Sequence, residues 1–199
     1  SKVDRLVLLH RLMAVTQSRF EDLAQAMSLE MGAPISMARE AHADAAVGHL
    51  QGFIDALEKI QERKKLASGD IQLREAIGVC GLITPWNWPM NQIALKVIPA
   101  LATGCTCVLK PSEHTPISAM IYAEIIHEAG FPAGVFNLVQ GDGPTVGAAM
   151  SRHPDIQMMS FTGSTRAGTA VTRDAADTVK RVTLELGGKS PNLVFADCD

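Results

Sequence analysis

Apolar residues recur at helical spacing through the first third of the chain. The residues that follow this spacing are Leu6, Leu9, Leu12, Met13, Phe20, Leu23, Ala24 and Met27. The pattern stops at Gly32-Ala33-Pro34, and a further helix is predicted over residues 37–65, with an alanine-rich face suited to packing against a sheet. Turn residues follow, and residues 71–74 predict a short edge strand.

From residue 77 onward the hydrophobic period changes to that of strands alternating with helices. Apolar, β-branched runs predict strands at residues 78–84, 106–109, 135–139, 158–161, 182–184 and 192–195. Helices are predicted between them at residues 91–103, 116–129, 144–150 and 164–177. This alternation indicates an α/β fold, in which right-handed crossovers build an open parallel sheet with helices on both faces, preceded by the N-terminal helices.

Composition is that of an ordinary globular chain. The 199 residues are 47% hydrophobic and 20% charged, enough for the core of one domain with pieces of a second. The net charge is -3 without a basic stripe, because Arg63-Lys64-Lys65 is predicted to close the helix over residues 37–65. This argues against nucleic-acid and membrane partners. No apolar run reaches the roughly 18 residues of a membrane span, and no signal peptide is recognisable. The chain begins at Ser1 and not at methionine, which is compatible with an N-terminal segment that precedes it.

The cysteines and histidines predict neither a disulfide framework nor a metal site. Cys105 and Cys107 alternate along one predicted strand, Cys80 falls in another, and Cys198 lies near the chain end. We therefore expect a reducing, cytoplasmic environment. The six histidines show no metal-ligand spacing, since His42 and His49 are seven residues apart and His127-Glu128 lacks a second histidine.

Five polar or glycine-rich clusters each follow a predicted strand directly. They are Pro85-Trp86-Asn87-Trp88-Pro89, Lys110-Pro111-Ser112-Glu113, Gly141-Asp142-Gly143, Thr162-Gly163-Ser164 and Glu185-Leu186-Gly187-Gly188. In an open parallel sheet the ligand crevice lies outside the carboxyl ends of the strands. Each cluster alone is equally well explained as turn chemistry, but the coincidence of five indicates a site.

The side chains of these clusters suggest roles and also have simpler explanations. Asn87 sits between stiff neighbours that would hold its amide for a developing oxyanion, or it stabilises its own turn. Lys110 and Glu113 could grip the hydroxyls of a ribose, or form a surface ion pair. Glu185 is a lone acid at the end of an apolar strand and before two glycines, a placement that suggests chemistry.

Two glycine-rich loops compete for a phosphate group. The loop of residues 141–147 is a near miss to the dinucleotide fingerprint, with one residue too many before its last glycine. The loop of residues 163–168 opens a helix after a strand, where backbone N–H groups and the helix dipole favour an anion. We favour this second loop for a pyrophosphate.

Nearly the whole chain resembles the aldehyde dehydrogenase family. The motifs that carry the resemblance stand in the family's order and are ITPWNWP, GCTCVLKPSE, HEAGFPAGVFNLVQGDGPTVG, FTGSTRAG and VTLELGGKSP. The resemblance implies most of a Rossmann-like NAD-binding domain. It also implies an enzyme that oxidises an aldehyde to a carboxylic acid through a cysteine thioester, with the nucleophilic cysteine further downstream than this chain extends. Ala76, where many members carry proline, is a minor departure.

The resemblance also implies residue roles. Asn87 matches the oxyanion amide and Glu185 the general base. The positions that match cofactor-binding residues are Ile83, Thr84, Pro85, Trp86, Lys110, Ser112, Glu113, Gly143, Gly147, Thr162, Gly163, Ser164 and Leu186.

Four segments follow from the same resemblance. Residues 1–65 would be the N-terminal helices of the coenzyme-binding domain, and residues 66–77 a short piece of an oligomerisation hairpin, which implies a homo-dimer or homo-tetramer. Residues 78–186 would form the NAD-binding βαβ domain, and residues 187–199 the start of a catalytic domain.

Two other functions stay open at this point. A CoA-acylating semialdehyde dehydrogenase shares the fold but does not need a water-activating acid, so Glu185 argues against it. A non-catalytic binding or structural protein on the same fold would also suit a chain without the nucleophile. The identity of the aldehyde cannot be read from these residues.

Overall fold

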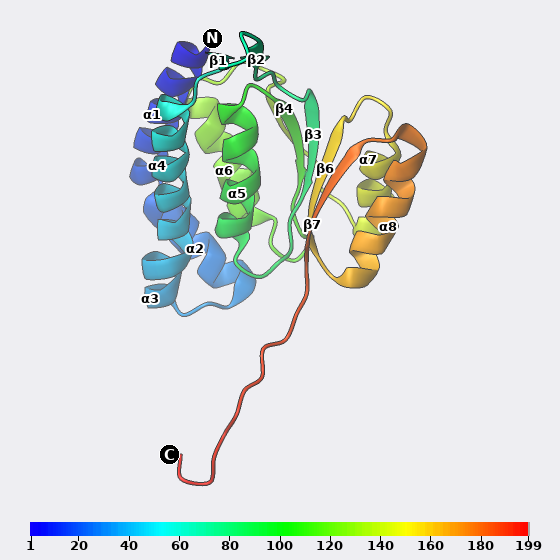
Figure 1. Cartoon of the computed structure of the whole chain (residues 1–199). Coiled ribbons are helices and arrows are strands. Elements are labelled where there is room, and N and C mark those ends of the chain that lie inside the picture. The colour runs from blue at the N-terminus through cyan, green and yellow to red at the C-terminus, as the bar shows by residue number, and fades with distance from the viewer. Residues whose placement is uncertain (199) are drawn as a thin grey trace.

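Five parallel strands form the central sheet of the computed structural model, which describes residues 1–198 (Figure 1). They are β3 (Val79–Ile83), β4 (Thr106–Lys110), β5 (Phe136–Leu138), β6 (Met158–Gly163) and β7 (Arg181–Leu186), in the order β5-β4-β3-β6-β7. All neighbouring pairs are parallel. The predicted α/β class is therefore confirmed. From β3 the chain adds β4 and β5 on one side of the sheet and then β6 and β7 on the other. The strand order therefore reverses between β3 and β6, the place where a sheet of this kind has its ligand crevice.

Helices cover both faces of the sheet, as predicted. Figure 1 shows α5 (Pro89–Ala102) and α6 (Ile117–Glu128) on one face, with α1 (Lys2–Ser18), α2 (Phe20–Met31) and α4 (Asp44–Lys59) forming a further layer outside them. The opposite face carries α7 (Ala148–Arg152) and α8 (Thr165–Ala175). Short turns complete the chain: α3 (Ile35–Met37), η1 (Ala38–Ala43), η2 (Gly143–Gly147) and η3 (Ala176–Thr178). No described helix has the length and apolarity needed to cross a bilayer.

The larger of two hydrophobic clusters lies between the sheet and the helical layers. Its fully buried side chains include Leu9, Leu12, Leu23, Met27, Leu50, Ile54, Met90, Ile93, Ile98, Leu109, Tyr122 and Ile125. Each fully buried side chain of this size contributes about 1.5–3 kcal/mol through the hydrophobic effect. The helical faces predicted from Leu9, Leu12, Leu23, Met27, Leu50 and Ile54 are thus confirmed. A smaller cluster around Met159 and Phe161 lies beneath α7 and α8.

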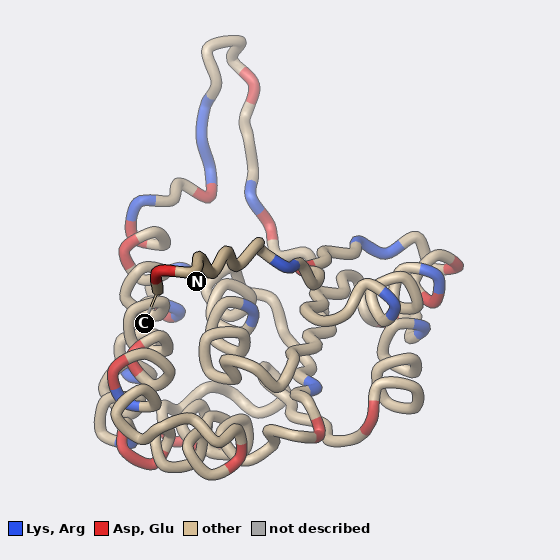
Figure 2. The backbone as a smooth tube through the Cα atoms, turned by 90° about the horizontal axis from the view of Figure 1, so that it is seen from below, with Lys and Arg blue, Asp and Glu red and all other residues tan. Residues whose placement is uncertain are grey.

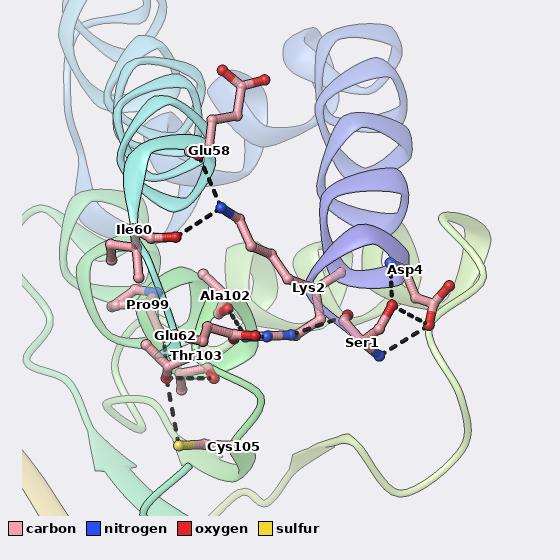
Figure 3. A network of polar contacts seen from close by, with 12 residues as sticks. Ser1, Lys2, Asp4, Glu58, Ile60, Glu62, Pro99, Ala102, Thr103 and Cys105 are labelled. Atoms are coloured by element: carbon pink, nitrogen blue, oxygen red, sulfur yellow. Dashed lines mark hydrogen bonds and ion pairs between the residues drawn. The ribbon is translucent and has the colours of Figure 1, made fainter. Parts of the chain in front are cut away.

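The helix predicted over residues 37–65 ends earlier than expected, at Lys59. Figure 3 shows the contact that accompanies this end: Lys2 Nζ, from α1, donates hydrogen bonds to the carbonyl oxygens of Glu58 (2.9 Å) and Ile60 (2.8 Å). These carbonyls lie at the helix C-terminus, where a cation is favourable. Ile60 has an extended backbone, so the chain leaves the helix here.

The next residues form a hairpin that projects from the body of the molecule (Figure 2). Strand β1 (Arg63–Lys65) pairs antiparallel with β2 (Ile71–Leu73), and Gly69 adopts a φ of 95° at the turn. The predicted edge strand is confirmed by β2. The prediction that Arg63-Lys64-Lys65 closes a helix is wrong, because these residues form an exposed strand.

The strand predicted at residues 192–195 is absent from the described structure. Residues 187–198 instead run away from the body as extended chain (Figure 1), and Leu193, Val194 and Phe195 are 75%, 75% and 71% exposed. A strand needs a partner for its backbone hydrogen bonds, and within residues 1–198 this run has none. The edge strand on this side of the sheet is therefore β7, and its Leu184 and Leu186 are partly exposed.

Candidate functional site

A cleft of about 830 Å³ lies at the carboxyl ends of β3, β4, β6 and β7, within the roughly 300–1,000 Å³ usual for ligand sites. It is lined by Ile83, Thr84, Pro85, Trp86, Asn87, Gln92, Lys110, Ser112, Glu113, His114, Gly143, Pro144, Phe161, Thr162, Gly163, Ser164, Arg166, Ala167, Glu185, Leu186, Gly187 and Gly188. All five predicted clusters contribute to it. Of the predicted site residues, Gly147 alone lies behind the wall, where an added Cβ would contact Ile83 Cδ1 at 3.6 Å.

Two buried threonine hydroxyls stand at the point where the strand order reverses. Thr84 follows β3 and is 3% exposed, and Thr162 lies in the neighbouring strand β6. Neither hydroxyl has a hydrogen-bond partner among residues 1–198. Leaving a buried polar group unpaired costs about 1–3 kcal/mol. These two unpaired hydroxyls mark the point of strand reversal as polar, although both oxygens lie within the wall and not at its surface.

Lys110 and Glu113 form an ion pair on one wall. Lys110 is 2% exposed, and its Nζ donates to the carbonyl of Pro111 (2.8 Å) and to Glu113 Oε2 (3.4 Å). The pKa of Glu113 is lowered, first by a hydrogen bond that its carboxylate accepts from the backbone N–H of Glu113 itself, and then by the charge of Lys110. Because Lys110 is buried, the pair is not an ordinary surface ion pair. It offers one cationic donor and one carboxylate acceptor side by side, the combination that binds a vicinal diol.

The loop after β3 places Trp86 and Asn87 against the cleft. Within residues 1–198 the Asn87 side chain makes no hydrogen bond, so it does not stabilise its own turn. Pro89 occupies the first helical position of α5, where its missing N–H is not needed. The Asn87 amide is thus free to act on a ligand.

The two glycine-rich loops differ in how their amide groups are used. In residues 141–147, the Asp142 carboxylate caps η2 by accepting a hydrogen bond from Thr145 N (2.7 Å). In residues 163–168, the neutral hydroxyl of Ser164 caps α8 by accepting from Ala167 N (3.2 Å). A carboxylate already occupies the first loop, whereas the second leaves the positive end of α8 open to an anion.

Glu185 lies in β7 opposite Thr162 and close to a lysine that the sequence pattern did not single out. Lys96, from α5, is 9% exposed and donates from Nζ to Ser160 Oγ (2.8 Å). Burial lowers the pKa of Lys96 to about 8, and the charge of Glu185 acts in the opposite direction. The available signal was a single lysine inside an otherwise apolar helix, Ile93-Ala94-Leu95-Lys96-Val97. The positive charge of Lys96 and the carboxylate of Glu185 thus influence each other across the sheet.

None of the four cysteines lines the cleft. Cys80, Cys105 and Cys107 are buried, and burial raises the pKa of the Cys80 and Cys107 thiols to about 12. Cys105 was predicted to lie in the same strand as Cys107, but it directly precedes β4. Cys198 is exposed on the extended segment after β7. In the part of the chain that the structure describes, no three His, Cys, Asp or Glu side chains gather as a metal ion would require.

Comparison with known proteins identifies the class to which this fold and cleft belong. The sequence matches the model of the Aldehyde dehydrogenase family over residues 1–199, so the chain belongs to this family. It is 52% identical to a 3-succinoylsemialdehyde-pyridine dehydrogenase of a Pseudomonas species, over 100% of this chain and 42% of that protein.

Solved structures agree with the sequence relatives. An aldehyde dehydrogenase of Bartonella henselae superposes with a TM-score of 0.94 at 52% identity, over 100% of this chain and 42% of that one. Aldehyde dehydrogenase C of Pseudomonas syringae, a cysteine-to-alanine variant in complex with NAD+ and octanal, gives 0.94 at 53% identity, over 100% and 41%. The chain thus spans about two fifths of the length of the relatives it matches.

Proposed function

We propose that this chain is the coenzyme-binding portion of an NAD-dependent aldehyde dehydrogenase of the hydrolytic type. The observation that carries the proposal is the single cleft that combines a diol-binding ion pair, an open helix N-terminus and a carboxylate. Family membership supports it, as does the Pseudomonas syringae relative, which was crystallised with NAD+.

The residues of the cleft suit the parts of a dinucleotide. Lys110 and Glu113 would hold the adenosine ribose, with Ser112 beside them, and Ser164 at the start of α8 would receive the pyrophosphate, with Thr162 and Gly163 next to it. Gly143 would leave room near the adenine, and Gly147 would lie by it behind the lining residues. The remaining wall would be formed by Ile83, Thr84, Pro85, Trp86 and Leu186. When bound, the nicotinamide supplies the acceptor for a hydride.

The chain's own residues would act on the carbonyl and on water. The Asn87 amide would donate a hydrogen bond to the oxygen that becomes negative when a thiolate attacks the aldehyde. Glu185 would take a proton from the water that hydrolyses the resulting thioester. Lys96, whose Nζ lies 2.8 Å from Ser160 Oγ, would favour the ionised form of Glu185 through its positive charge. The thiolate itself must come from outside the four cysteines described above.

Two alternative functions are less well supported. A CoA-acylating semialdehyde dehydrogenase would use CoA and not water, and would have no need of Glu185 in the lining of the cleft. A non-catalytic protein on this fold would have no use for a buried cation beside that acid.

The wider biological setting is part of the same proposal. The projecting β1–β2 hairpin would contribute to a homo-dimer or homo-tetramer, and residues 1–65, 66–77, 78–186 and 187–199 would divide the chain as expected from the resemblance. The substrate would be a small-molecule aldehyde. We infer a cytoplasmic protein without nucleic-acid or membrane partners.

Binding of NAD to the purified chain tests this function most directly. Titration with NAD should quench the fluorescence of Trp86 at the cleft, and Lys110→Met should weaken binding about tenfold, the effect of removing one charged hydrogen bond. Lys59→Met, at an exposed position, is the matched control and should bind as the wild type does. Absence of binding at millimolar NAD would remove the coenzyme assignment.

Coenzyme choice should depend on Glu113. Its ionised carboxylate would repel the 2′-phosphate of NADP, and like charges at this range and partial burial disfavour each other by about 1 kcal/mol or more, which corresponds to a preference for NAD of at least about fivefold. Glu113→Gln should reduce this preference in competitive binding measurements. Glu40→Gln, at an exposed position, should leave it unchanged. Equal binding of NAD and NADP by the wild type, with no change in the glutamine variant, would show that Glu113 does not face the ribose.

A further inference from the structure

His42 is a completely buried side chain to which the proposed function gives no role. It lies in the π-helical turn η1 and is 0% exposed. Its ring packs on the indole of Trp88, with the ring centroids 4.5 Å apart and the planes tilted by 36°. Neither ring nitrogen has a hydrogen-bond partner among residues 1–198, and burial lowers the pKa of the imidazole. Among the described residues, the specific contact of this neutral ring is therefore the one with Trp88.

Trp88 has a backbone conformation that a bulky residue rarely adopts. Its φ of 57° and ψ of 55° lie in the left-handed region, which disfavours any residue with a Cβ atom. Such conformations persist only where the surroundings hold them, and they cluster at functional sites. This turn separates Trp86 and Asn87, which line the cleft, from Pro89, which begins α5. The backbone at Trp88 therefore sets the direction in which the chain passes from Trp86 and Asn87 into α5.

The segment that carries His42 also holds the start of α5 at a second point. His49 lies in α4, the helix that follows η1. Its Nε2 forms a hydrogen bond with Asn91 Oδ1 at 2.7 Å. Asn91 is in the first turn of α5, three residues after Trp88. The wide π turn at η1 is a departure from regular helix of the kind often found at functional sites. One contact thus reaches Trp88 at the end of the loop, and the other reaches Asn91 in the first turn of α5.

We propose that His42 is a positioning residue for the coenzyme cleft: its neutral ring, stacked on Trp88, holds the loop of residues 84–89 in the conformation that presents Trp86 and Asn87 to the ligand. His42 performs this role through the stacking of its aromatic ring and not through hydrogen bonds of its ring nitrogens. The part of the inference that concerns NAD rests on the proposed function, whereas the ordering of the loop does not.

The test uses Trp88 as its own reporter. The chain contains two tryptophans, so in a Trp86→Phe background all tryptophan emission comes from Trp88. Without NAD, His42→Phe, which keeps a ring, should retain the emission maximum and the acrylamide quenching of this background. His42→Leu, which keeps apolar bulk but no ring, should shift the emission to longer wavelength and raise quenching. His42→Met provides the ring-free comparison if His42→Leu does not fold.

Coenzyme affinity provides the second readout, measured by calorimetry with Trp86 present. An aromatic pair of this kind corresponds to a change of about three- to tenfold, so the dissociation constant for NAD should rise by that factor in His42→Leu and by less than about twofold in His42→Phe. Leu12→Ala is the control for stability, since Leu12 is buried in the outer helical layer. It should lower the melting temperature but leave Trp88 emission and NAD affinity unchanged.

The outcomes separate this inference from the proposed function. Wild-type Trp88 emission in the ring-free variants, or equal disturbance by phenylalanine and leucine, would overturn the positioning role of the ring. If the wild type does not bind NAD, the proposed function fails, and the Trp88 measurement still decides whether His42 orders the loop.

Discussion

Glutamine in place of Glu185 is expected to leave NADH formation in the first turnover intact and to slow every later turnover. The measurement needs a nucleophilic cysteine, which a chimera supplies: residues 1–199 replace the corresponding part of the wild-type Pseudomonas syringae aldehyde dehydrogenase, with its cysteine restored. This chain is 53% identical to that protein. Hydride transfer precedes hydrolysis of the thioester, and only hydrolysis needs a base. Rapid mixing should therefore show a burst of NADH close to one per site, followed by steady-state turnover reduced about 10²- to 10⁴-fold.

The control distinguishes this effect from a general loss of negative charge. Glu75→Gln alters an exposed carboxylate near the hairpin and should leave both phases unchanged. A burst lost together with the steady state would place Glu185 at or before hydride transfer. Unchanged turnover would take it out of the mechanism and return the CoA-acylating alternative to consideration.

The arrangement of the sheet could be predicted because its signals are local. Each strand from β3 to β7 carries its own apolar run, and each is separated from the next by a segment of helical period. The sequence-based predictions failed where a contact between residues far apart in the chain determines the local structure. The end of α4 coincides with a contact from Lys2, more than fifty residues earlier, which no window around Lys59 contains. The apolar run at residues 192–195 has strand propensity, but propensity supplies no hydrogen-bonding partner.

The difference between local signals and distant contacts also explains which residues of the cleft could be predicted. Its lining could be predicted from residues that directly follow strands, because parallel strands bring their carboxyl ends to one edge. Lys96 and His42 lie inside helical segments, where neighbouring residues say nothing about Ser160 or Trp88. The sequence led us to consider His42 only as a metal ligand, and the structure gives it an aromatic partner instead. Residues that act through tertiary contacts from within helices are those that sequence patterns miss.

The protein comprising residues 1–199 is expected to show no aldehyde-dependent formation of NADH, whichever aldehyde is supplied. Oxidation through a thioester needs a thiolate within bonding reach of the carbonyl and opposite the nicotinamide. Cys80 and Cys107 are buried thiols with a pKa of about 12, and Cys105 is buried beside them. Cys198 is exposed on the extended segment beyond the cleft, with no part in its lining.

NAD binding and catalysis should therefore separate in this chain. The purified protein is mixed with NAD and a panel of short, long and aromatic aldehydes, and the absorbance of NADH is followed beside the fluorescence titration that reports binding. Binding without turnover is the expected result, because the Lys110–Glu113 ion pair and the open N-terminal end of α8 line the cleft and no described cysteine does. The chimera described above, given the same aldehydes, should restore turnover. Aldehyde-dependent NADH from the 199-residue protein that disappears in Cys198→Ser would instead identify Cys198 as the nucleophile, brought to the cleft by a movement of residues 187–198.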